Sequence, residues 1–247
     1  MTSRPDWLEP LPDAGQQRAT DEWAISARGI AGATLMECAG AGLAELIIVR
    51  APAGRVVVVC GKGNNGGDGL VVARLLREQG RDVDVLLLAP GDELQGDAQA
   101  NFARLPGPAA RSFVPDALAG AAVIVDAILG TGFSGEPREP ARSAIEAING
   151  APGAPVVIAC DVPSGVDAST GEVAGVAVRA CATATFHAGK PGLWIAPGKD
   201  HAGEVTVIDI GIPPGVPGRP STEIIEAAVL AEILQRSREL PCLFCTF

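Results

Sequence analysis

The chain has 247 residues, of which 47% are hydrophobic and 19% charged, with 31 glycines and 20 prolines. This composition is typical of one large globular domain and excludes a chain that is disordered throughout. The formal net charge of −10 would repel a phosphate backbone, and no basic stripe offsets it. Nucleic acid is therefore excluded as a partner.

The N-terminal region carries acidic residues and prolines where a secretory signal would need a basic segment followed by an apolar one. The apolar runs are too short to predict a membrane span, and the run from Ala119 to Leu129 is interrupted by Asp126. We predict a cytoplasmic protein without a membrane partner. Cys242 and Cys245 lack the second ligand pair of a zinc site. The other four cysteines are predicted to be buried free thiols: Cys38, Cys60, Cys160 and Cys181.

Two helices are predicted between Gln16 and Val49, with a break at Arg28 to Gly32. Short apolar strands then alternate with helical stretches, which is the pattern of a mostly parallel sheet covered on both faces. The strands are predicted at Val56 to Cys60, Val83 to Leu88, Ala122 to Asp126, Val156 to Asp161, Ala182 to Phe186 and Val205 to Ile210. The helices between them are predicted at Leu70 to Gln79, Asp97 to Leu105 and Pro140 to Ile148. The fold class is therefore α/β.

A proline-rich run from Pro213 to Pro220 cannot form regular structure and is predicted to be a linker. Residues 1–220 are accordingly predicted to form one domain. Residues 221–247 would add an amphipathic helix from Glu223 to Gln235 and a tail that resembles a truncated end.

The strand ending at Cys60 runs into Gly61-Lys62-Gly63-Asn64-Asn65-Gly66, a formal match to the G-x-G-x-x-G dinucleotide fingerprint. The acidic residue that would hold a ribose hydroxyl is missing at the end of the next strand, so the match alone is weak. The loop continues through Gly67-Asp68-Gly69, which adds a carboxylate to two side-chain amides. Asp68 could instead cap the helix predicted from Leu70.

Two further strands end in an aspartate. Asp126 precedes the loop Gly130 to Glu136, and Asp161 precedes Val162-Pro163-Ser164-Gly165. Because the carboxyl ends of parallel strands lie together, Asp126, Asp161 and the asparagine loop are predicted to converge in one crevice. Carboxylates there either share a proton or are neutralised by a hard cation, although each aspartate alone could be a turn-former. A fourth strand end brings Lys190 to the same edge, as an electrophile, a phosphate contact or a counter-charge.

Five ordered blocks of the chain form a recognisable set. They are Leu35-Met36-Glu37 with Ala39-Gly40, Gly63-Asn64-Asn65-Gly66-Gly67-Asp68-Gly69-Leu70, Val125-Asp126-Ala127-Ile128-Leu129-Gly130-Thr131-Gly132, Asp161-Val162-Pro163-Ser164-Gly165-Val166-Asp167 and Lys190-Pro191-Gly192. With these blocks the chain resembles one known family, that of NAD(P)H-hydrate epimerase, the YjeF N-terminal domain, over about residues 11 to 212. This resemblance implies a Rossmann-like three-layer α/β/α sandwich.

The resemblance implies an isomerase that interconverts the R and S epimers of the hydrated cofactors NADHX and NADPHX. It implies coupling to an ADP- or ATP-dependent dehydratase specific for the S epimer, and members are often homodimers. Asp161 is the expected acid-base residue, with Lys190 as a second catalytic candidate. A potassium ion would be held by Asn65, Asp126 and Ser164. The residues expected to bind the substrate are Asn64, Asn65, Gly66, Gly67, Asp68, Gly130, Thr131, Gly132, Phe133, Ser134, Gly135, Glu136 and Asp161.

The chain departs from the family pattern at Cys38, where asparagine is usual. Many bacterial members continue into a dehydratase domain after a helix like Glu223 to Gln235, so no dehydratase activity is expected of this chain. Two other functions remain open: a non-catalytic nucleotide-binding or scaffold protein on the same fold, and an ordinary NAD-dependent oxidoreductase.

Overall fold

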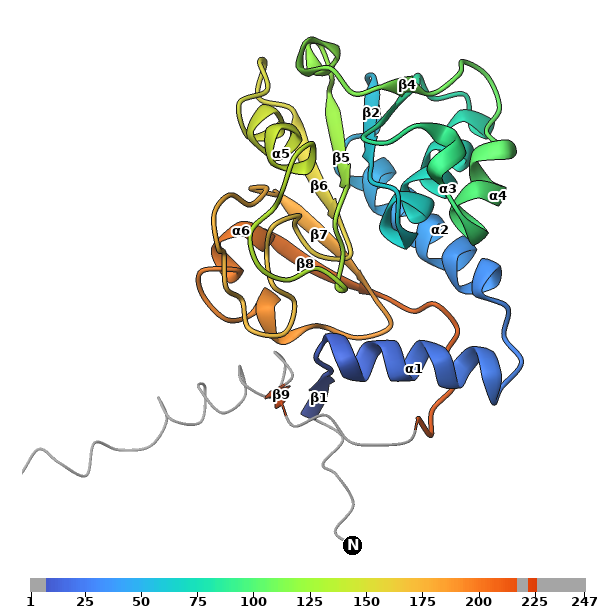
Figure 1. The fold of residues 1–247 in the computed structure, drawn as a ribbon, viewed down its shortest axis with the longest axis vertical. Helices are drawn as coiled ribbons and strands as arrows, with labels where there is room; N and C mark the ends of the chain where they lie inside the picture. Colours follow the sequence, from blue (N-terminus) through green and yellow to red (C-terminus); the bar gives the residue numbers. More distant parts are fainter. Residues whose placement is uncertain (1–7, 217–221, 226–247) are drawn as a thin grey trace, which may run out of the picture.

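A parallel sheet between layers of helices forms the centre of the molecule (Figure 1). The computed structural model describes residues 8–216 and 222–225. Seven strands pair in the order β4-β3-β2-β5-β6-β7-β8, and every pairing is parallel. The strands are β2 (Val56–Cys60), β3 (Val83–Leu87), β4 (Arg111–Ser112), β5 (Val123–Ala127), β6 (Val156–Cys160), β7 (Ala182–Phe186) and β8 (Glu204–Ile208).

The order of the strands fixes where a ligand can bind. The chain enters the middle of the sheet at β2, adds β3 and β4 on one side, and then returns to add β5 to β8 on the other. This is the doubly wound order 3-2-1-4-5-6 with one further strand. The order reverses between β2 and β5, and open α/β sheets bind ligands outside the carboxyl ends of the strands at this switch point. The predicted fold class is confirmed.

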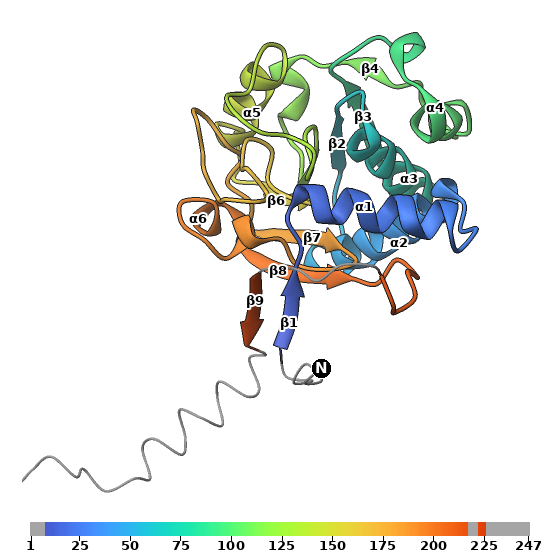
Figure 2. The same cartoon turned by 60° about the horizontal axis from the view of Figure 1, so that its bottom comes forward.

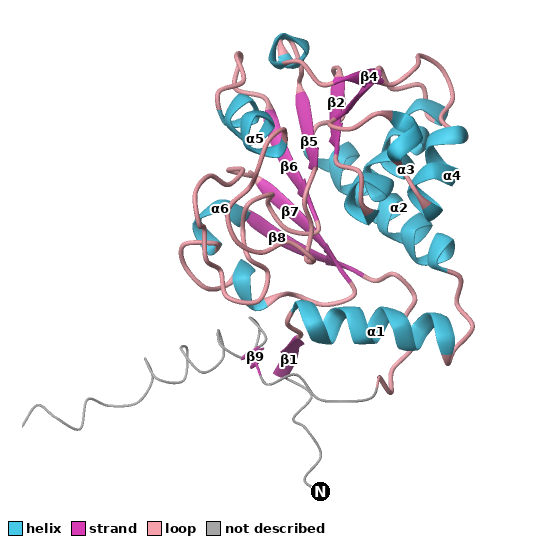
Figure 3. Cartoon of the chain, viewed as in Figure 1, coloured by secondary structure: helices cyan, strands magenta, loops and turns pink. Residues whose placement is uncertain are grey.

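The period-two alternation of the strands supplies both faces of the sheet with apolar side chains. Val56 and Val58 of β2 belong to a core shared with helices α2 and α3, whereas Val57 and Val59 face the core under α5. Figure 3 shows the helices arranged around the sheet. They are α1 (Ala14–Ser26), α2 (Gly32–Arg50), α3 (Asn64–Glu78), α4 (Gly96–Ala103), α5 (Ala141–Asn149) and α6 (Lys199–Ala202), with short 3-10 turns η1 (Gly91–Glu93), η2 (Pro115–Leu118) and η3 (Pro191–Leu193).

The first two helices confirm the predicted break. Helix α1 begins at a capping box, in which the Asp13 carboxylate accepts from the Gln16 N–H and the Gln16 side chain accepts from the Asp13 N–H. The prediction that every apolar run is too short to span a membrane is wrong for helix α2, because its length and composition alone would allow it to cross a bilayer. Its side chains Leu43 and Ile47 are fully buried in the core of the domain. Such burial favours a core helix.

Helix α3 begins at Asn64, whereas the sequence predicted a loop up to Gly69 and a helix from Leu70. The glycines that argue against a helix are there because α3 packs against neighbouring backbone. A Cβ on Gly66 would lie 1.9 Å from the Gly61 carbonyl oxygen, and one on Gly69 would lie 2.6 Å from the Ala127 Cβ. The N-cap residue is Gly63 and no side chain caps the helix, so Asp68 does not cap it. Asp68 lies in the second turn instead.

A small antiparallel ladder joins β1 (Leu8–Leu11) to β9 (Thr222–Ile225), two segments that Figure 2 shows side by side. The sequence predicted neither strand, and the helix expected from Glu223 is wrong at its beginning, where residues 222–225 are a strand. The remainder of that helix, the boundary at residue 220 and Cys242 with Cys245 lie outside the described residues. The division into two regions therefore stays a prediction.

The predicted buried thiols are confirmed at Cys60 and Cys160, and burial raises the pKa of the Cys60 thiol to about 12. The prediction is wrong at Cys181, which is exposed just before β7. Cys38, the departure from the family pattern, is half-buried on α2 against the core.

Candidate functional site

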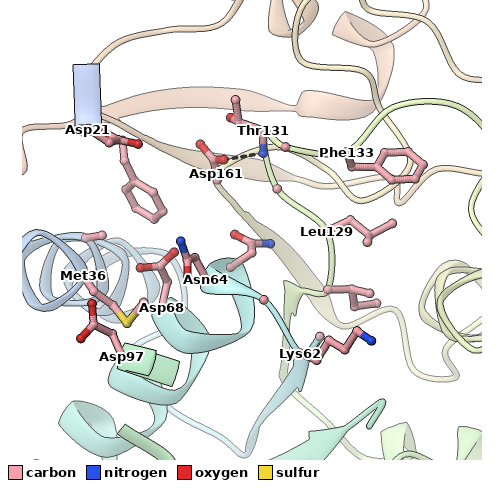
Figure 4. A pocket seen from close by; sticks show the side chains of 18 of the residues that line it. Asp21, Met36, Lys62, Asn64, Asp68, Asp97, Leu129, Thr131, Phe133 and Asp161 are labelled. Atoms are coloured by element: carbon pink, nitrogen blue, oxygen red, sulfur yellow. Dashed lines mark hydrogen bonds between the residues drawn. The ribbon is translucent and has the colours of Figure 1, made fainter. Parts of the chain in front are cut away.

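A cavity of about 950 Å³ lies at the carboxyl ends of the central strands, where the topology predicts a ligand site (Figure 4). Its walls are the turn after β2, the loop after β5, and single residues that follow β6 and β7. Helix α1 contributes Gln17, Arg18 and Asp21, and α2 contributes Leu35 and Met36. A smaller cavity of about 380 Å³ shares Leu129, Phe133 and Ala141 with it.

Asp161 is the best-held acidic side chain of the cavity. It follows β6 directly with a φ of 68°, a left-handed conformation that is uncommon for a residue other than glycine and is often found at functional sites. One carboxylate oxygen accepts the Thr131 N–H at 2.7 Å, as Figure 4 shows. The other accepts Lys190 Nζ at 2.9 Å. The side chain is 13% exposed, so it remains accessible from the cavity.

Lys190 is a buried cation with every donor used. It is 1% exposed, and Nζ donates to Asp161, to Thr185 Oγ1 at 2.8 Å and to the Phe186 carbonyl at 2.9 Å. Burial alone would raise the pKa of Asp161, but the Lys190 charge and the hydrogen bonds from Thr131 and Lys190 outweigh it and hold that pKa below its usual value. Asp161 is therefore an ionised carboxylate fixed at the wall of the cavity.

Two buried side chains beside Asp161 lack hydrogen-bond partners. Both amide atoms of Asn65 and the Oγ1 atom of Thr131 are inaccessible to solvent and have no partner. Gly130 passes between these groups, since a Cβ there would lie 3.0 Å from Asp161 Oδ2 and 3.1 Å from Asn65 Oδ1. Buried polar atoms are nearly always hydrogen-bonded, so these unpaired atoms are candidates to bind a ligand or an ion.

Asp126 does not line the cavity, although the sequence predicted that it would converge there with Asp161. It is fully buried near the end of β5, where Ser164 donates to it through N–H at 2.8 Å and through Oγ at 2.6 Å. The Ile128 N–H donates at 3.3 Å. Burial outweighs these hydrogen bonds and raises the pKa of Asp126 to about 6. Asp126 and Ser164 thus form a buried clamp between the loops after β5 and β6.

The other predicted substrate-binding residues fall into three groups. Asn64, Asn65, Asp68 and the run Gly130 to Phe133 line the main cavity. Ser134, Gly135 and Glu136 line the smaller one. Gly66 and Gly67 line neither, because they are the points where α3 meets its neighbours: a Cβ on Gly67 would lie 2.7 Å from Met36 Cε.

Sequence reasoning missed the contribution of α1. Asp21 borders the cavity, and burial raises its pKa against a hydrogen bond from Gln17 and the charge of Lys190. One sequence feature could have indicated it: Gln17 and Thr20 are polar residues one helical turn apart, and they lie on the buried face of α1. Met36 and Phe186, whose roles in the cavity depend on tertiary packing, gave no such signal.

The fold and the cavity define a Rossmann-like α/β domain with a small-molecule site at its switch point, built around an aspartate–lysine pair. Within the described part of the chain, no group of three or more His, Cys, Asp and Glu side chains could hold a metal ion.

The chain belongs to the family described as "YjeF-related protein N-terminus", whose model matches residues 32–192. It is 44% identical over 219 residues to an NAD(P)H-hydrate epimerase of Pirellula staleyi, covering 83% of this chain and 94% of that protein. It is 40% identical to an NAD(P)H-hydrate epimerase of Rhodopirellula baltica, covering 79% and 82%. The predicted family is confirmed.

A longer relative and a solved structure also match the chain. A bifunctional NAD(P)H-hydrate repair enzyme Nnr of Salinibacter ruber is 44% identical over 90% of this chain, which spans 45% of that protein. The crystal structure of the yeast protein Ynu0 (YNL200c) superposes with a TM-score of 0.66, over 87% of this chain and 99% of that one. At 21% identity, the yeast structure supports the fold alone.

Proposed function

We propose that this chain is an NAD(P)H-hydrate epimerase, an isomerase that interconverts the R and S epimers of NADHX and NADPHX. The observation that carries the proposal is the ionised Asp161 carboxylate, fixed by Lys190 and facing a cavity at the switch point. The names of the relatives that match most of the chain support the same reaction.

The chemistry of the substrate explains why a fixed carboxylate is needed. The epimerised carbon carries a hydroxyl group and is bonded to the ring nitrogen, so loss of that hydroxyl leaves a cation that the nitrogen lone pair stabilises. A carboxylate that is already ionised and oriented stabilises the cation without reorganisation. It also accepts the proton of the water that adds to the other face. The geometry of Asp161 suits both tasks.

We also propose that a potassium ion supports the site through Asn65, Asp126 and Ser164. All three offer oxygen atoms, which hard cations prefer. The Asn65 amide oxygen is buried without a partner, and the buried Asp126 carboxylate has no ion-pair partner among residues 8–216. The residues therefore fit a cation. Its contribution when bound would be to neutralise Asp126 and to hold the loops around the cavity.

The wider context is proposed from the relatives. The name of the bifunctional Salinibacter protein describes repair of NAD(P)H-hydrate, which supports functional coupling of this chain to a dehydratase. We propose in addition that the main cavity binds a nucleotide, that the protein is cytoplasmic and that it forms a homodimer.

The test is conversion of the R epimer of NADHX to the S epimer, followed by proton NMR with and without the protein, in potassium and in lithium buffer. We expect acceleration above the spontaneous rate, loss of the acceleration in Asp161→Ala, and a lower rate in lithium. A wild-type protein that leaves the spontaneous rate unchanged would show that the function is wrong. Reduction of NAD⁺ in the presence of alcohols or hydroxy acids would instead identify an oxidoreductase.

A further inference from the structure

Asp68 is a buried carboxyl group to which the mechanism above gives no role. It lies in the second turn of α3, is 9% exposed and borders the main cavity. Its side chain makes no hydrogen bond to any residue of the described chain. Asp126 and Asp161, by contrast, each accept at least two. The carboxyl group of Asp68 is therefore free to meet a ligand.

Acidic side chains outnumber basic ones around the cavity, six to three. Asp21 from α1, Asp68 from α3 and Asp161 from the end of β6 border one cavity, together with the Lys190 ammonium. Lys190 is committed to Asp161 at 2.9 Å. Burial, then repulsion from Asp161 and Asp21, raises the pKa of Asp68 well above its usual value, and Lys190 offsets this only in part. A single cavity thus holds one carboxyl group whose pKa is raised and another whose pKa is lowered.

Such a pair of environments divides acid and base work between two similar side chains. Asp68 from α3 and Asp161 from the end of β6 both border the cavity, as Figure 4 shows. Epimerisation needs this division, because the hydroxyl leaves one face of the ring and water adds to the other. One group must give a proton to the leaving oxygen, and another must take a proton from the entering oxygen.

Resting on the proposed function, we propose that Asp68 is a catalytic residue, the general acid for the departing hydroxyl. Its proton passes to the hydroxyl oxygen, the carbon–oxygen electron pair leaves with water, and the nitrogen lone pair forms the carbon–nitrogen double bond. A water molecule then forms the new carbon–oxygen bond on the other face, the electron pair of the carbon–nitrogen double bond returns to the nitrogen, and the water gives a proton to Asp161. The Asp68 carboxylate and the Asp161 carboxyl group return to their resting states by exchanging protons with solvent. Nothing is oxidised or reduced.

The primary test replaces Asp68 with asparagine, which keeps the shape but supplies no acidic proton. In Asp68→Asn we expect kcat to fall about 100- to 10,000-fold with KM changed only a few-fold. Asp82→Asn is the matched control, because Asp82 is exposed beside the amino end of β3, at the edge of the sheet away from the cavity. Its kcat should equal that of the wild type.

Two further measurements separate an acid from a residue that only binds or supports. Small carboxylic acids should restore activity to Asp68→Ala in proportion to their protonated fraction. In the wild type, the rate should fall at alkaline pH as Asp68 loses its proton, at a pH that the charges of Asp21, Asp161 and Lys190 help to set. This fall in rate should be absent in Asp68→Asn.

The outcomes are distinct. A wild-type protein without epimerase activity contradicts the proposed function itself. An active wild type with an Asp68→Asn variant that keeps more than a tenth of kcat, or that changes KM alone, overturns the role of Asp68 only. If Asp68→Asn does not fold by circular dichroism, the ¹³C shift of the Asp68 carboxyl in the wild type decides. A protonated carboxyl at pH 7 supports the proposal, and an ionised one overturns it.

Discussion

Asp126 and Asp161 lie at the ends of neighbouring parallel strands, yet one carboxylate is buried in the structure and the other faces the cavity. Asp126 is the penultimate residue of β5 and still follows the pleat of the strand, so its carboxylate is buried on the face under α5 and holds Ser164. Asp161 comes one residue after β6, where a left-handed backbone turns the side chain toward the cavity. In register, Asp161 lies two positions beyond Ala159, the residue that pairs with Asp126, so the step past the strand end separates a structural clamp from a reactive group.

The partners of the two carboxylates sharpen this difference. Asp161 has a full cationic partner in Lys190, whereas Asp126 has only neutral donors among the described residues. Their pKa values accordingly move in opposite directions from the ordinary value, to about 6 for Asp126 and downward for Asp161. The comparison predicts that removing the Asp161 charge lowers the free energy of unfolding more than removing a hydrogen-bond partner of Asp126.

The largest effect is expected when the Asp161–Lys190 pair is broken. Asp161→Asn leaves the Lys190 ammonium buried without its anion, which should lower the free energy of unfolding by about 3–5 kcal/mol. The double variant Asp161→Asn with Lys190→Met removes both charges, so it should recover much of that loss but none of the activity. Urea unfolding at pH 7 measures the stability of both variants, and the epimerase assay measures their activity. Equal stability of the single and double variants would contradict the importance of the pair.

The same pair sets a pH dependence. Because the pKa of Asp161 is lowered on folding, its contribution to stability is complete above the unfolded value of about 3.9 and is lost as the pH falls through the folded value. The wild type should therefore lose more stability than Asp161→Asn between pH 4 and pH 2. Urea midpoints across this range check the sign, and parallel curves would be the contrary result.

An intermediate effect is expected at the clamp. Ser164→Ala removes the 2.6 Å hydrogen bond to a fully buried carboxylate and should reduce the free energy of unfolding by about 1–3 kcal/mol. Ser143→Ala is a matched control, because Ser143 Oγ donates to the exposed Glu139 carboxylate at the same 2.6 Å. The control should change stability by less than about 0.5 kcal/mol. If the two variants lose equal stability, burial does not strengthen the clamp.

Asp126 and Asp161 also show which parts of the fold and the site could be predicted from the sequence. Six of the seven strands of the main sheet were predicted within one or two residues, because β-branched runs bounded by turn residues leave few alternatives, whereas the two-residue strand β4 was missed. That Asp161 and the asparagine motif line one cavity followed from parallel topology alone. The glycines of α3 concealed a helix, since their role is close packing against Gly61 and Met36, which no local pattern reports.

What the sequence could not supply was the direction of individual side chains. Asp126 and Asp161 gave the same signal, and only the φ of Asp161 and the pleat of β5 separate them. The helix predicted from Glu223 failed because pairing with Leu8–Leu11, more than 200 positions away in the chain, overrides local helical preference.

The smallest effect is expected at Thr131, whose backbone and side chain act separately. The N–H holds Asp161 and survives any substitution other than proline, whereas Oγ1 is buried without a partner. Thr131→Val keeps the shape and removes only the hydroxyl, so stability should be unchanged or slightly higher. If a bound substrate satisfies Oγ1, KM should rise about tenfold, equivalent to about 1.4 kcal/mol, with kcat little changed. Thr170→Val, at an exposed turn outside both cavities, is the control. A fall in kcat at constant KM would instead mean that the Thr131 hydroxyl acts with Asp161 in the transition state.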